Sequence, residues 1–368
     1  MSRFLCFLLA VALSASASAQ QPPAPAVPTP HKWAVAIHGG AGVLQRAAGM
    51  SPHVELAYRN GIKEALLAAS AILDKGGSSL DAVEAAIKLL EDNPNFNAGR
   101  GAVFAADGTI QLDAAVMDGA TLRAGAVADV QHTRHPISLA RAVMEQSPHV
   151  MLIGSGADDF AASIHLEQVP QSFFFTERRW QQLATELTRQ GLPIPTRPQG
   201  APVPPVGGPS IGPHAPKPTA FSEMPDAHKF GTVGVVALDR QGNVAAGTST
   251  GGIAGKRWNR VGDSPVIGAG TYASNQSCAV SATGAGEFFI RLTVARTICA
   301  LVQYKGMSLQ AAADEVIHKQ LTALHGDGGV IALTPDGQVT WSYNTPGMFR
   351  GKVIEGGTSQ VAIYDDEP

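Results

Sequence analysis

The chain has 368 residues, of which 45% are hydrophobic and 15% are charged, and its formal net charge is -3 at pH 7. This length and apolar content suffice for a substantial buried core. The near balance of charge excludes a strongly basic surface, so we expect no nucleic-acid partner. The 40 glycines suit closely packed sheets and loops in which the backbone approaches a ligand.

Residues 1–19 have the pattern of a secretory signal peptide. Arg3 supplies the positive charge, an apolar run extends from Phe4 to Leu13, and Ala17-Ser-Ala19 resembles a cleavage site. The apolar run is too short to span a bilayer and no later stretch approaches the required length, so we expect no transmembrane helix and no membrane partner. The sequence therefore predicts an exported protein, periplasmic or secreted, with a Pro/Ala-rich flexible leader over residues 20–31.

Two cysteines remain after the predicted signal. Cys278 lies in an apparent strand and Cys299 in an apolar helical pattern. Two cysteines in an exported chain can pair, but these apolar surroundings favour two buried free thiols, and a metal site on them is not expected.

Residues 32–190 contain both strands and helices. A strand over 32–37 runs into a tight glycine-rich loop, His38-Gly-Gly-Ala-Gly42, which lacks the lysine and the spacing of a phosphate-binding loop. The remaining patterns predict helices over 52–75, 79–90, 136–144, 156–163 and 177–189, and strands over 102–105, 110–117, 122–130 and 150–153.

The segment after the second of these helices runs Glu91-Asp-Asn-Pro-Asn-Phe-Asn-Ala-Gly-Arg-Gly101. It has too many turn-forming residues for regular structure. Its backbone carbonyls could surround a hard monovalent cation. On these residues alone, an ordinary connecting loop is at least an equal interpretation.

Residues 191–231 form a proline- and glycine-rich linker with almost no apolar period. A structureless segment of this length within a compact domain is either functional or disordered. It leads directly to Thr232, after which residues 233–238 read as a buried strand. If the Gly231–Thr232 bond were cut, Thr232 would carry a hydroxyl beside an amine with a pKa of about 8, a nucleophile with its own base. An ordinary threonine at the start of a strand is the alternative.

Residues 232–368 continue with a hairpin over 233–239 and 243–248. The other predicted strands cover 267–272, 278–282, 330–333, 339–343 and 361–364, and helices begin at 283 and 308. Strands cluster on both sides of the linker, with helices before and after them. This order favours two stacked sheets covered by helices over an alternating βα fold.

Four features at or after the cleavage junction supply different parts of one reaction. The junction threonine is the nucleophile, and Thr250 offers a hydroxyl that could polarise it. Arg260 and Asp263 could hold the carboxylate and the ammonium of an amino acid. Thr283 and Gly284 could donate hydrogen bonds to a developing oxyanion. Taken singly, each also fits an ordinary role, as a turn cap, a surface ion pair or a helix start.

In combination, these residues resemble the plant-type L-asparaginase/isoaspartyl peptidase family of N-terminal-nucleophile hydrolases. The resemblance covers roughly residues 33–365 and omits the signal and much of the linker. It rests on seven motifs in the family's order, namely His38-Gly-Gly-Ala-Gly42, Phe96-Asn-Ala-Gly99 with Gly101-Ala-Val-Phe104, Asp113-Ala-Ala-Val-Met-Asp-Gly119, Gly231-Thr-Val-Gly234, Thr248-Ser-Thr-Gly-Gly252, Arg260-Val-Gly-Asp-Ser-Pro265 and Thr283-Gly-Ala-Gly-Glu287.

The resemblance implies an α+β fold, a four-layer αββα sandwich formed by one domain. It implies that the precursor cuts itself into an α chain ending at Gly231 and a β chain starting at Thr232. Thr232 would then attack the side-chain carbonyl of L-asparagine or the isopeptide carbonyl of a β-aspartyl dipeptide. Thr250 would support the nucleophile, and Thr283 and Gly284 would form the oxyanion hole.

The resemblance also assigns the substrate contacts and the assembly. Arg260 would bind the α-carboxylate and Asp263 the α-amine, with Gly284 and Gly286 also lining the substrate site. No cofactor is implied for catalysis, and the implied working unit is a homodimer of αβ heterodimers. The loop over 90–100 resembles a sodium-binding loop that coordinates mainly through backbone carbonyls, with candidate ligands Leu90, Glu91, Asn93, Phe96, Ala98 and Arg100.

A second hypothesis competes with this enzyme. The export signal and the Arg260/Asp263 pair also fit a catalytically inactive exported amino-acid binding protein. Such a protein would remain uncut and would still bind aspartate. The placement of a Gly-Thr sequence at the end of the linker argues against it, because a pure binding protein gains nothing from that dipeptide there.

Overall fold

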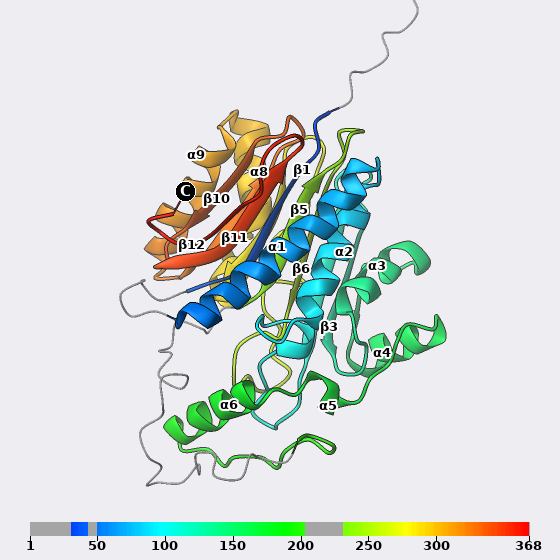
Figure 1. The fold of residues 1–368 in the computed structure, drawn as a ribbon, viewed down its shortest axis with the longest axis vertical. Helices are drawn as coiled ribbons and strands as arrows, with labels where there is room; N and C mark the ends of the chain where they lie inside the picture. Colours follow the sequence, from blue (N-terminus) through cyan, green and yellow to red (C-terminus); the bar gives the residue numbers. More distant parts are fainter. Residues whose placement is uncertain (1–30, 43–49, 203–230, 368) are drawn as a thin grey trace, which may run out of the picture. The chain divides into compact units, whose positions relative to one another are not determined.

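The computed structural model describes residues 31–42, 50–202 and 231–367. The predicted signal over 1–19, nearly all of the leader over 20–31 and most of the linker over 191–231 lie outside the described residues. Within them the fold is a mixed α+β arrangement of two sheets and their covering helices (Figure 1).

The larger sheet has eight strands in the order β12-β11-β1-β5-β6-β2-β3-β4. Neighbouring strands are antiparallel except for β3 and β4, which are parallel. Strand β5, which follows the linker, lies between β1 and β6 at the centre of the sheet. The strands are β1 (Ala34–Ala41), β2 (Leu112–Asp118), β3 (Ala124–Val130), β4 (Met151–Ile153), β5 (Val233–Leu238), β6 (Val244–Thr250), β11 (Gly347–Ile354) and β12 (Gln360–Tyr364).

The smaller sheet has four antiparallel strands in the order β10-β9-β8-β7. They are β7 (Thr271–Ala273), β8 (Ala279–Gly284), β9 (Gly328–Leu333) and β10 (Val339–Tyr343). All four come from the part of the chain after the linker.

The helices fall into two groups along the chain. Those before the linker are α1 (Pro52–Asp74), α2 (Ser79–Asp92), the 3-10 turn η2 (Gly99–Gly101), α3 (Pro136–Gln146), α4 (Gly154–Ser163), α5 (Gln171–Phe174) and α6 (Glu177–Arg189). Those after it are α7 (Gly286–Leu292), α8 (Val294–Lys305), α9 (Leu309–Asp314) and the π-helix η4 (Glu315–Leu321). No helix in the described ranges is both long and apolar enough to cross a membrane.

Both faces of the larger sheet are buried. Alternate residues of a strand point to opposite faces, so the residues of one strand enter two different apolar clusters. In β5, Val233 and Val235 belong to an apolar cluster shared with α1, α2 and α3. Val236 and Leu238 belong to another cluster, shared with Ile331 of β9. The smaller sheet buries its other face under α7, α8 and α9. A strand buried on both faces reads as an uninterrupted apolar run, which is how β5 appears in the sequence.

Several predicted elements differ from the observed ones. Strand β1 continues through His38 to Ala41 with an irregularity in its pairing, where the glycines had predicted a loop. The predicted strand over 102–105 has no regular structure. Thr283 and Gly284 end strand β8 instead of opening a helix, and the following helix is broken at Thr293, whose φ is 45°.

The prediction of two free thiols is wrong, because Cys278 and Cys299 form a disulfide. Cys278 directly precedes β8 and Cys299 lies in α8, which packs on that strand. Their Cα atoms are 5.3 Å apart, within the range that a disulfide requires. Both residues are fully buried, as predicted, but burial alone did not reveal that they face each other.

Candidate active site

Thr232 lies at the entrance of β5 and is 8% exposed. Its hydroxyl oxygen is 3.0 Å from that of Thr250, to which it donates. The pairing of β5 with β6, in which Val233 faces Ser249, brings the two threonines side by side. Because Thr250 Oγ1 also accepts from the backbone N–H of Gly252 at 3.0 Å, it is held in place as the acceptor of the hydrogen bond from Thr232. This hydrogen bond fixes the direction of the Thr232 O–H bond and leaves the lone pairs of Thr232 Oγ1 pointing away from Thr250.

The peptide bond before Thr232 is held by a residue that the sequence had only placed in a motif. The backbone N–H of Asn97 donates to the carbonyl oxygen of Gly231 at 3.1 Å. The Asn97 side chain is itself fixed, because its Oδ1 accepts from Val103 N at 2.9 Å and its Nδ2 donates to Gly252 O at 2.8 Å. A backbone donor on the carbonyl of the Gly231–Thr232 bond is the arrangement that stabilises negative charge on that oxygen.

His38 contacts the main chain of Thr232. Its Nδ1 lies 3.0 Å from the carbonyl oxygen of Thr232, and its Nε2 lies 3.0 Å from Ser281 Oγ. Burial lowers the pKa of His38 to about 3, against the opposing effect of the bond to Thr232. The imidazole is therefore neutral and touches the carbonyl instead of the hydroxyl, so it is no base for the nucleophile.

The structure brings Arg260, Asp263 and Gly286 together. A Cβ atom on Gly286 would lie 2.8 Å from Arg260 Nη2 and 2.9 Å from Asp263 Oδ1, so only glycine fits between them. Arg260 Nε and Nη2 donate to the two carboxylate oxygens of Glu287 at 2.8 and 2.9 Å. Sequence reasoning did not foresee this partner, although Glu287 closes the last of the quoted motifs.

Asp263 is buried, and its Oδ2 has no hydrogen-bond partner within the described part of the chain. Burial raises the pKa of this carboxyl to about 7, in spite of the nearby Arg260. A buried carboxylate oxygen without a partner costs free energy that a cationic ligand would recover.

Thr283 and Gly284 stand at the end of β8. Thr283 Oγ1 is buried and has no hydrogen-bond partner among the residues that the structure describes. Because residues two apart on a strand point to one face, Thr283 lies on the same face of β8 as Ser281, whose hydroxyl contacts His38 beneath Thr232. The backbone of the Asp263 loop reaches the same strand, since Gly270 N donates to Asp263 O and Gly270 O accepts from Ala282 N. The backbone contacts and strand faces therefore connect Thr232 with both unsatisfied groups.

The loop over 90–101 crowds its carbonyl oxygens together. A Cβ on Gly99 would lie 2.3 Å from Glu91 O, and one on Gly101 would lie 2.0 Å from Phe96 O and 2.7 Å from Pro94 O. Glycine at both positions thus allows these carbonyl oxygens to approach the backbone closely. Pro94 O also accepts from Arg178 Nη2 at 2.9 Å. No group of three or more His, Cys, Asp or Glu side chains suited to a metal occurs in the described ranges, which leaves carbonyls as candidate ligands.

The other candidate ligands of this loop are placed as follows. The carbonyls of Leu90, Asn93 and Ala98 accept backbone hydrogen bonds within the loop at 3.3, 3.2 and 3.1 Å. The Arg100 guanidinium lies 6.0 Å from the ring centroid of Phe173. The Glu91 side chain points into the protein, where its Oε1 accepts from Ser249 Oγ at 2.6 Å, and burial raises its pKa to about 8.

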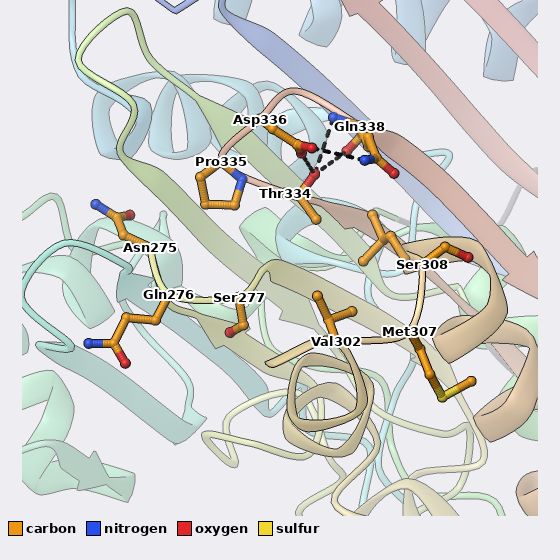
Figure 2. A pocket seen from close by; sticks show the side chains of 11 residues that line it. Asn275, Gln276, Ser277, Val302, Met307, Ser308, Thr334, Pro335, Asp336 and Gln338 are labelled. Carbon is orange, nitrogen blue, oxygen red and sulfur yellow. Dashed lines mark hydrogen bonds between the residues drawn. The ribbon is translucent and has the colours of Figure 1, made fainter. Parts of the chain in front are cut away.

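A cavity of about 290 Å³ at one end of the smaller sheet contains none of the predicted site residues. Figure 2 shows Ser277 on one side of it and the Thr334, Asp336 and Gln338 group on another. Asp336 accepts from the side chains of Thr334 and Gln338, so both of its carboxylate oxygens already have a hydrogen-bond partner. This cavity is separate from the candidate active site.

Comparisons with known proteins identify the family of the chain. A family model described as asparaginase matches residues 31–363. The chain is 46% identical to the "Isoaspartyl peptidase" of Escherichia coli (strain K12) over 336 residues, 91% of this chain and 97% of that protein. It is 39% identical to the "Probable isoaspartyl peptidase/L-asparaginase 2" of Arabidopsis thaliana, over 90% of this chain and 99% of that protein.

An archaeal relative extends the range of this similarity. The chain is 38% identical to the "Plant-type L-asparaginase" of Pyrococcus furiosus, over 88% of this chain and 97% of that protein. The range matched by the family model, residues 31–363, covers nearly all the described residues and includes every predicted site residue. The chain therefore belongs to the asparaginase family that contains the isoaspartyl peptidases and plant-type L-asparaginases.

Proposed function

We propose that this chain is a self-cleaving amidohydrolase. It removes β-aspartyl residues from isoaspartyl dipeptides and hydrolyses L-asparagine to L-aspartate and ammonia. The observation that carries the proposal is the contact between Thr232 Oγ1 and Thr250 Oγ1 directly after a Gly231 carbonyl that accepts from Asn97 N–H. Relatives at 37 to 46% identity are named isoaspartyl peptidase or isoaspartyl peptidase/L-asparaginase, which supports the same reaction class.

In the first step Thr232 Oγ1 attacks the carbonyl carbon of Gly231. The C–N bond of the Gly231–Thr232 peptide breaks, an ester to Oγ1 forms, and the hydroxyl proton passes to the released amine. Asn97 N–H stabilises the oxygen as it gains negative charge. Water then hydrolyses the ester, which leaves a carboxylate on Gly231 and a free α-amine on Thr232.

In the second reaction the free amine takes the proton of Thr232 Oγ1 as this oxygen attacks the substrate amide. The amide C–N bond breaks, ammonia or an amino acid leaves with the proton, and water releases aspartate from the resulting ester. The unsatisfied Thr283 Oγ1 and the Gly284 N–H are the proposed oxyanion donors. Arg260 binds the substrate α-carboxylate in exchange for Glu287, and Asp263 binds the α-amine, with Gly284 and Gly286 lining the site.

The remaining parts of the proposal concern the scaffold. We infer a four-layer αββα arrangement, supported by the three apolar clusters between helices and sheets and between the sheets. We propose a structural Na⁺ among the crowded carbonyls of the 90–101 loop and a homodimer of αβ heterodimers as the working unit. The proposed reaction uses groups of the chain and its substrate together with water, and no cofactor.

Export to the periplasm or the medium is proposed from the pattern of residues 1–19. The disulfide between Cys278 and Cys299 supports an oxidising compartment. The names of the relatives do not support the alternative of a catalytically inactive exported binding protein.

The test is mass spectrometry of the purified protein combined with two assays. We expect a fragment beginning with Thr232, and release of aspartate from a β-aspartyl dipeptide and from L-asparagine. A chain that stays uncut at Gly231–Thr232, releases no aspartate and yet binds aspartate would contradict the proposal and would favour the inactive binding protein.

A further inference from the structure

A chain of polar side chains crosses the otherwise apolar space between the two sheets. From His38 Nε2 it passes to Ser281 Oγ at 3.0 Å, from there to Thr248 Oγ1 at 2.7 Å, and then to Thr271 Oγ1 at 2.6 Å. All four residues are fully buried. Apolar side chains such as those of Val236 and Ile331 form a buried cluster between the same strands. Four buried polar groups in such a place are costly unless each is satisfied.

The direction of each hydrogen bond between these four side chains follows from the bond at the His38 end. The carbonyl oxygen of Thr232 can only accept, so Nδ1 of His38 carries the hydrogen and Nε2 is an acceptor. Ser281 therefore donates to Nε2 and must accept from Thr248. Thr248 in turn accepts from Thr271 at 2.6 Å. The single hydroxyl hydrogens of Thr248 and Thr271 are then used within the network, so Gly270 O, 3.3 Å from Thr248 Oγ1, and Ser264 O, 3.0 Å from Thr271 Oγ1, are neighbours that receive no hydrogen from it. The imidazole stays neutral, because burial holds its pKa at about 3.

Gly234, two residues after Thr232, makes room for this arrangement. Gly234 lies between His38 and Thr248 in the register of β1, β5 and β6. A Cβ atom at Gly234 would lie 1.9 Å from Ser281 Oγ and 2.3 Å from His38 Nε2. The second glycine of the Gly231-Thr-Val-Gly234 sequence is therefore the position at which the two side chains meet.

The four hydrogen-bonded side chains contact three parts of the proposed active site. At one end His38 holds the main chain of Thr232. Ser281 lies on β8, two residues before Thr283. At the other end Thr271 Oγ1 lies 3.0 Å from the carbonyl oxygen of Ser264, which adjoins Asp263. A shift at any of these side chains would change the position of the nucleophile relative to the oxyanion donor and the ammonium-binding group.

We propose that His38, Ser281, Thr248 and Thr271 form a positioning network that sets the placement of Thr232 against Thr283 and Asp263. The inference rests on the proposed function and deepens it. These are positioning residues, because His38 contacts the Thr232 carbonyl and the three hydroxyls contact one another instead of the reacting atoms. Since misplacement by about 1 Å costs on the order of 100-fold in rate, the network is expected to affect kcat more than KM.

The test compares Thr248→Val with Thr248→Ser. Valine keeps the shape and removes the hydroxyl, whereas serine keeps the hydroxyl. Activity is divided by the amount of fragment that begins with Thr232, so that slow self-cleavage does not count as slow hydrolysis. We expect Thr248→Val to lower kcat for a β-aspartyl dipeptide by about 10- to 100-fold with KM changed less than about threefold, and Thr248→Ser to recover most of the loss.

Thr340→Val is the matched control. Thr340 is a buried strand threonine of the smaller sheet whose hydroxyl bonds to Gln310 outside the network. It should lower the melting temperature without lowering kcat. Ser281→Ala combined with Thr248→Val should lose no more activity than the worse single variant, because both interrupt one chain.

Four results would overturn the network. They are an unchanged kcat in Thr248→Val, an equal loss in Thr340→Val, no recovery in Thr248→Ser, and losses that multiply in the double variant. The wild-type chain, measured beside the variants, separates this inference from the proposed function. An uncut and inactive wild-type chain would defeat both, whereas an active wild type with an equally active Thr248→Val defeats the network alone.

Discussion

The two halves of the candidate site differ in how far their polar groups are satisfied. Around Thr232, the Thr250 hydroxyl and the Gly231 carbonyl both have partners. On the substrate side, Asp263 Oδ2 and Thr283 Oγ1 are buried and have no partner within the described ranges. A buried polar atom without a partner costs about 1–3 kcal/mol. The first half is thus complete without a ligand, which suits the proposed self-cleavage, and the second has two buried groups that the proposed substrate would satisfy.

The largest effect is expected from removal of the hydroxyl of Thr232, the proposed nucleophile. Thr232→Ala should abolish self-cleavage and lower hydrolysis by at least about 10⁴-fold, because no other hydroxyl takes its place. Thr232→Ser should retain part of both activities, since it keeps the oxygen but relaxes χ1. Mass spectrometry and aspartate release measure the two effects. Processing that continues in the alanine variant would place the nucleophile elsewhere.

The substrate half alone is tested by Asp263→Asn. The neutral amide cannot pair with the substrate ammonium, so kcat/KM for L-asparagine should fall by about 10²- to 10³-fold. Self-cleavage should continue, because the nucleophile half needs no substrate. The matched control is Asp336→Asn, which alters an exposed carboxylate that is already paired. Uncut Asp263→Asn protein would show that the two halves are not independent.

The nucleophile half alone is tested by Asn97→Ala. The backbone N–H on the Gly231 carbonyl remains, but its two side-chain anchors to Val103 and Gly252 are lost. We expect self-cleavage to slow by about 10-fold, followed as the decay of uncut chain on a gel. Hydrolysis by protein that has already been cut should change less. The reverse order of effects would assign Asn97 to the substrate half.

The smallest expected effect concerns the scaffold beneath the nucleophile. Glu91 bonds to Ser249, the neighbour of Thr250, and its pKa is about 8 in the folded chain compared with 4.5 as the reference value. Between these values the folded chain holds a proton that the unfolded chain releases, so stability falls as the pH rises through this window.

Glu91→Gln should remove that dependence. We expect the melting temperature of the wild type to fall, relative to that of Glu91→Gln, by a few degrees between about pH 5 and about pH 8. Glu315→Gln, at a carboxylate paired with Lys319 on a helix surface, is the control. An identical pH response in wild type and Glu91→Gln would mean that Glu91 is ionised in the folded chain.

Several elements that carry the predicted site residues differ from the ones that the sequence indicated. The central strand β5 was predictable because both of its faces are buried and its residues, apart from Gly234, are all apolar. Strand β6 begins with apolar residues but ends in Thr248, Ser249 and Thr250, and it was predicted as the second strand of a hairpin. Strand β11 was not predicted, because Gly347-Met-Phe-Arg-Gly-Lys352 follows no simple alternation. The His38 glycines suggested a loop by composition, whereas pairing with β11 and β5 keeps them in a strand.

The residues missed by sequence reasoning act through contacts between distant segments. Asn97 reaches Gly231 from a loop more than a hundred positions earlier, and Ser281 reaches His38 across two sheets. Nothing in the local pattern of either residue indicates its partner. The available signal was Gly234, two residues after Thr232. A glycine within an apolar strand indicates that another group approaches the backbone closely at that position.

The position of the disulfide has a practical consequence. Cys278 and Cys299 both follow Thr232, so opening of the Gly231–Thr232 bond would leave the two pieces without a covalent link between them through this bridge. They would stay associated because β1, from the first piece, is inserted between β5 and β11 of the second. Electrophoresis in detergent without any thiol reagent should therefore already separate them, whereas gel filtration in plain buffer should not.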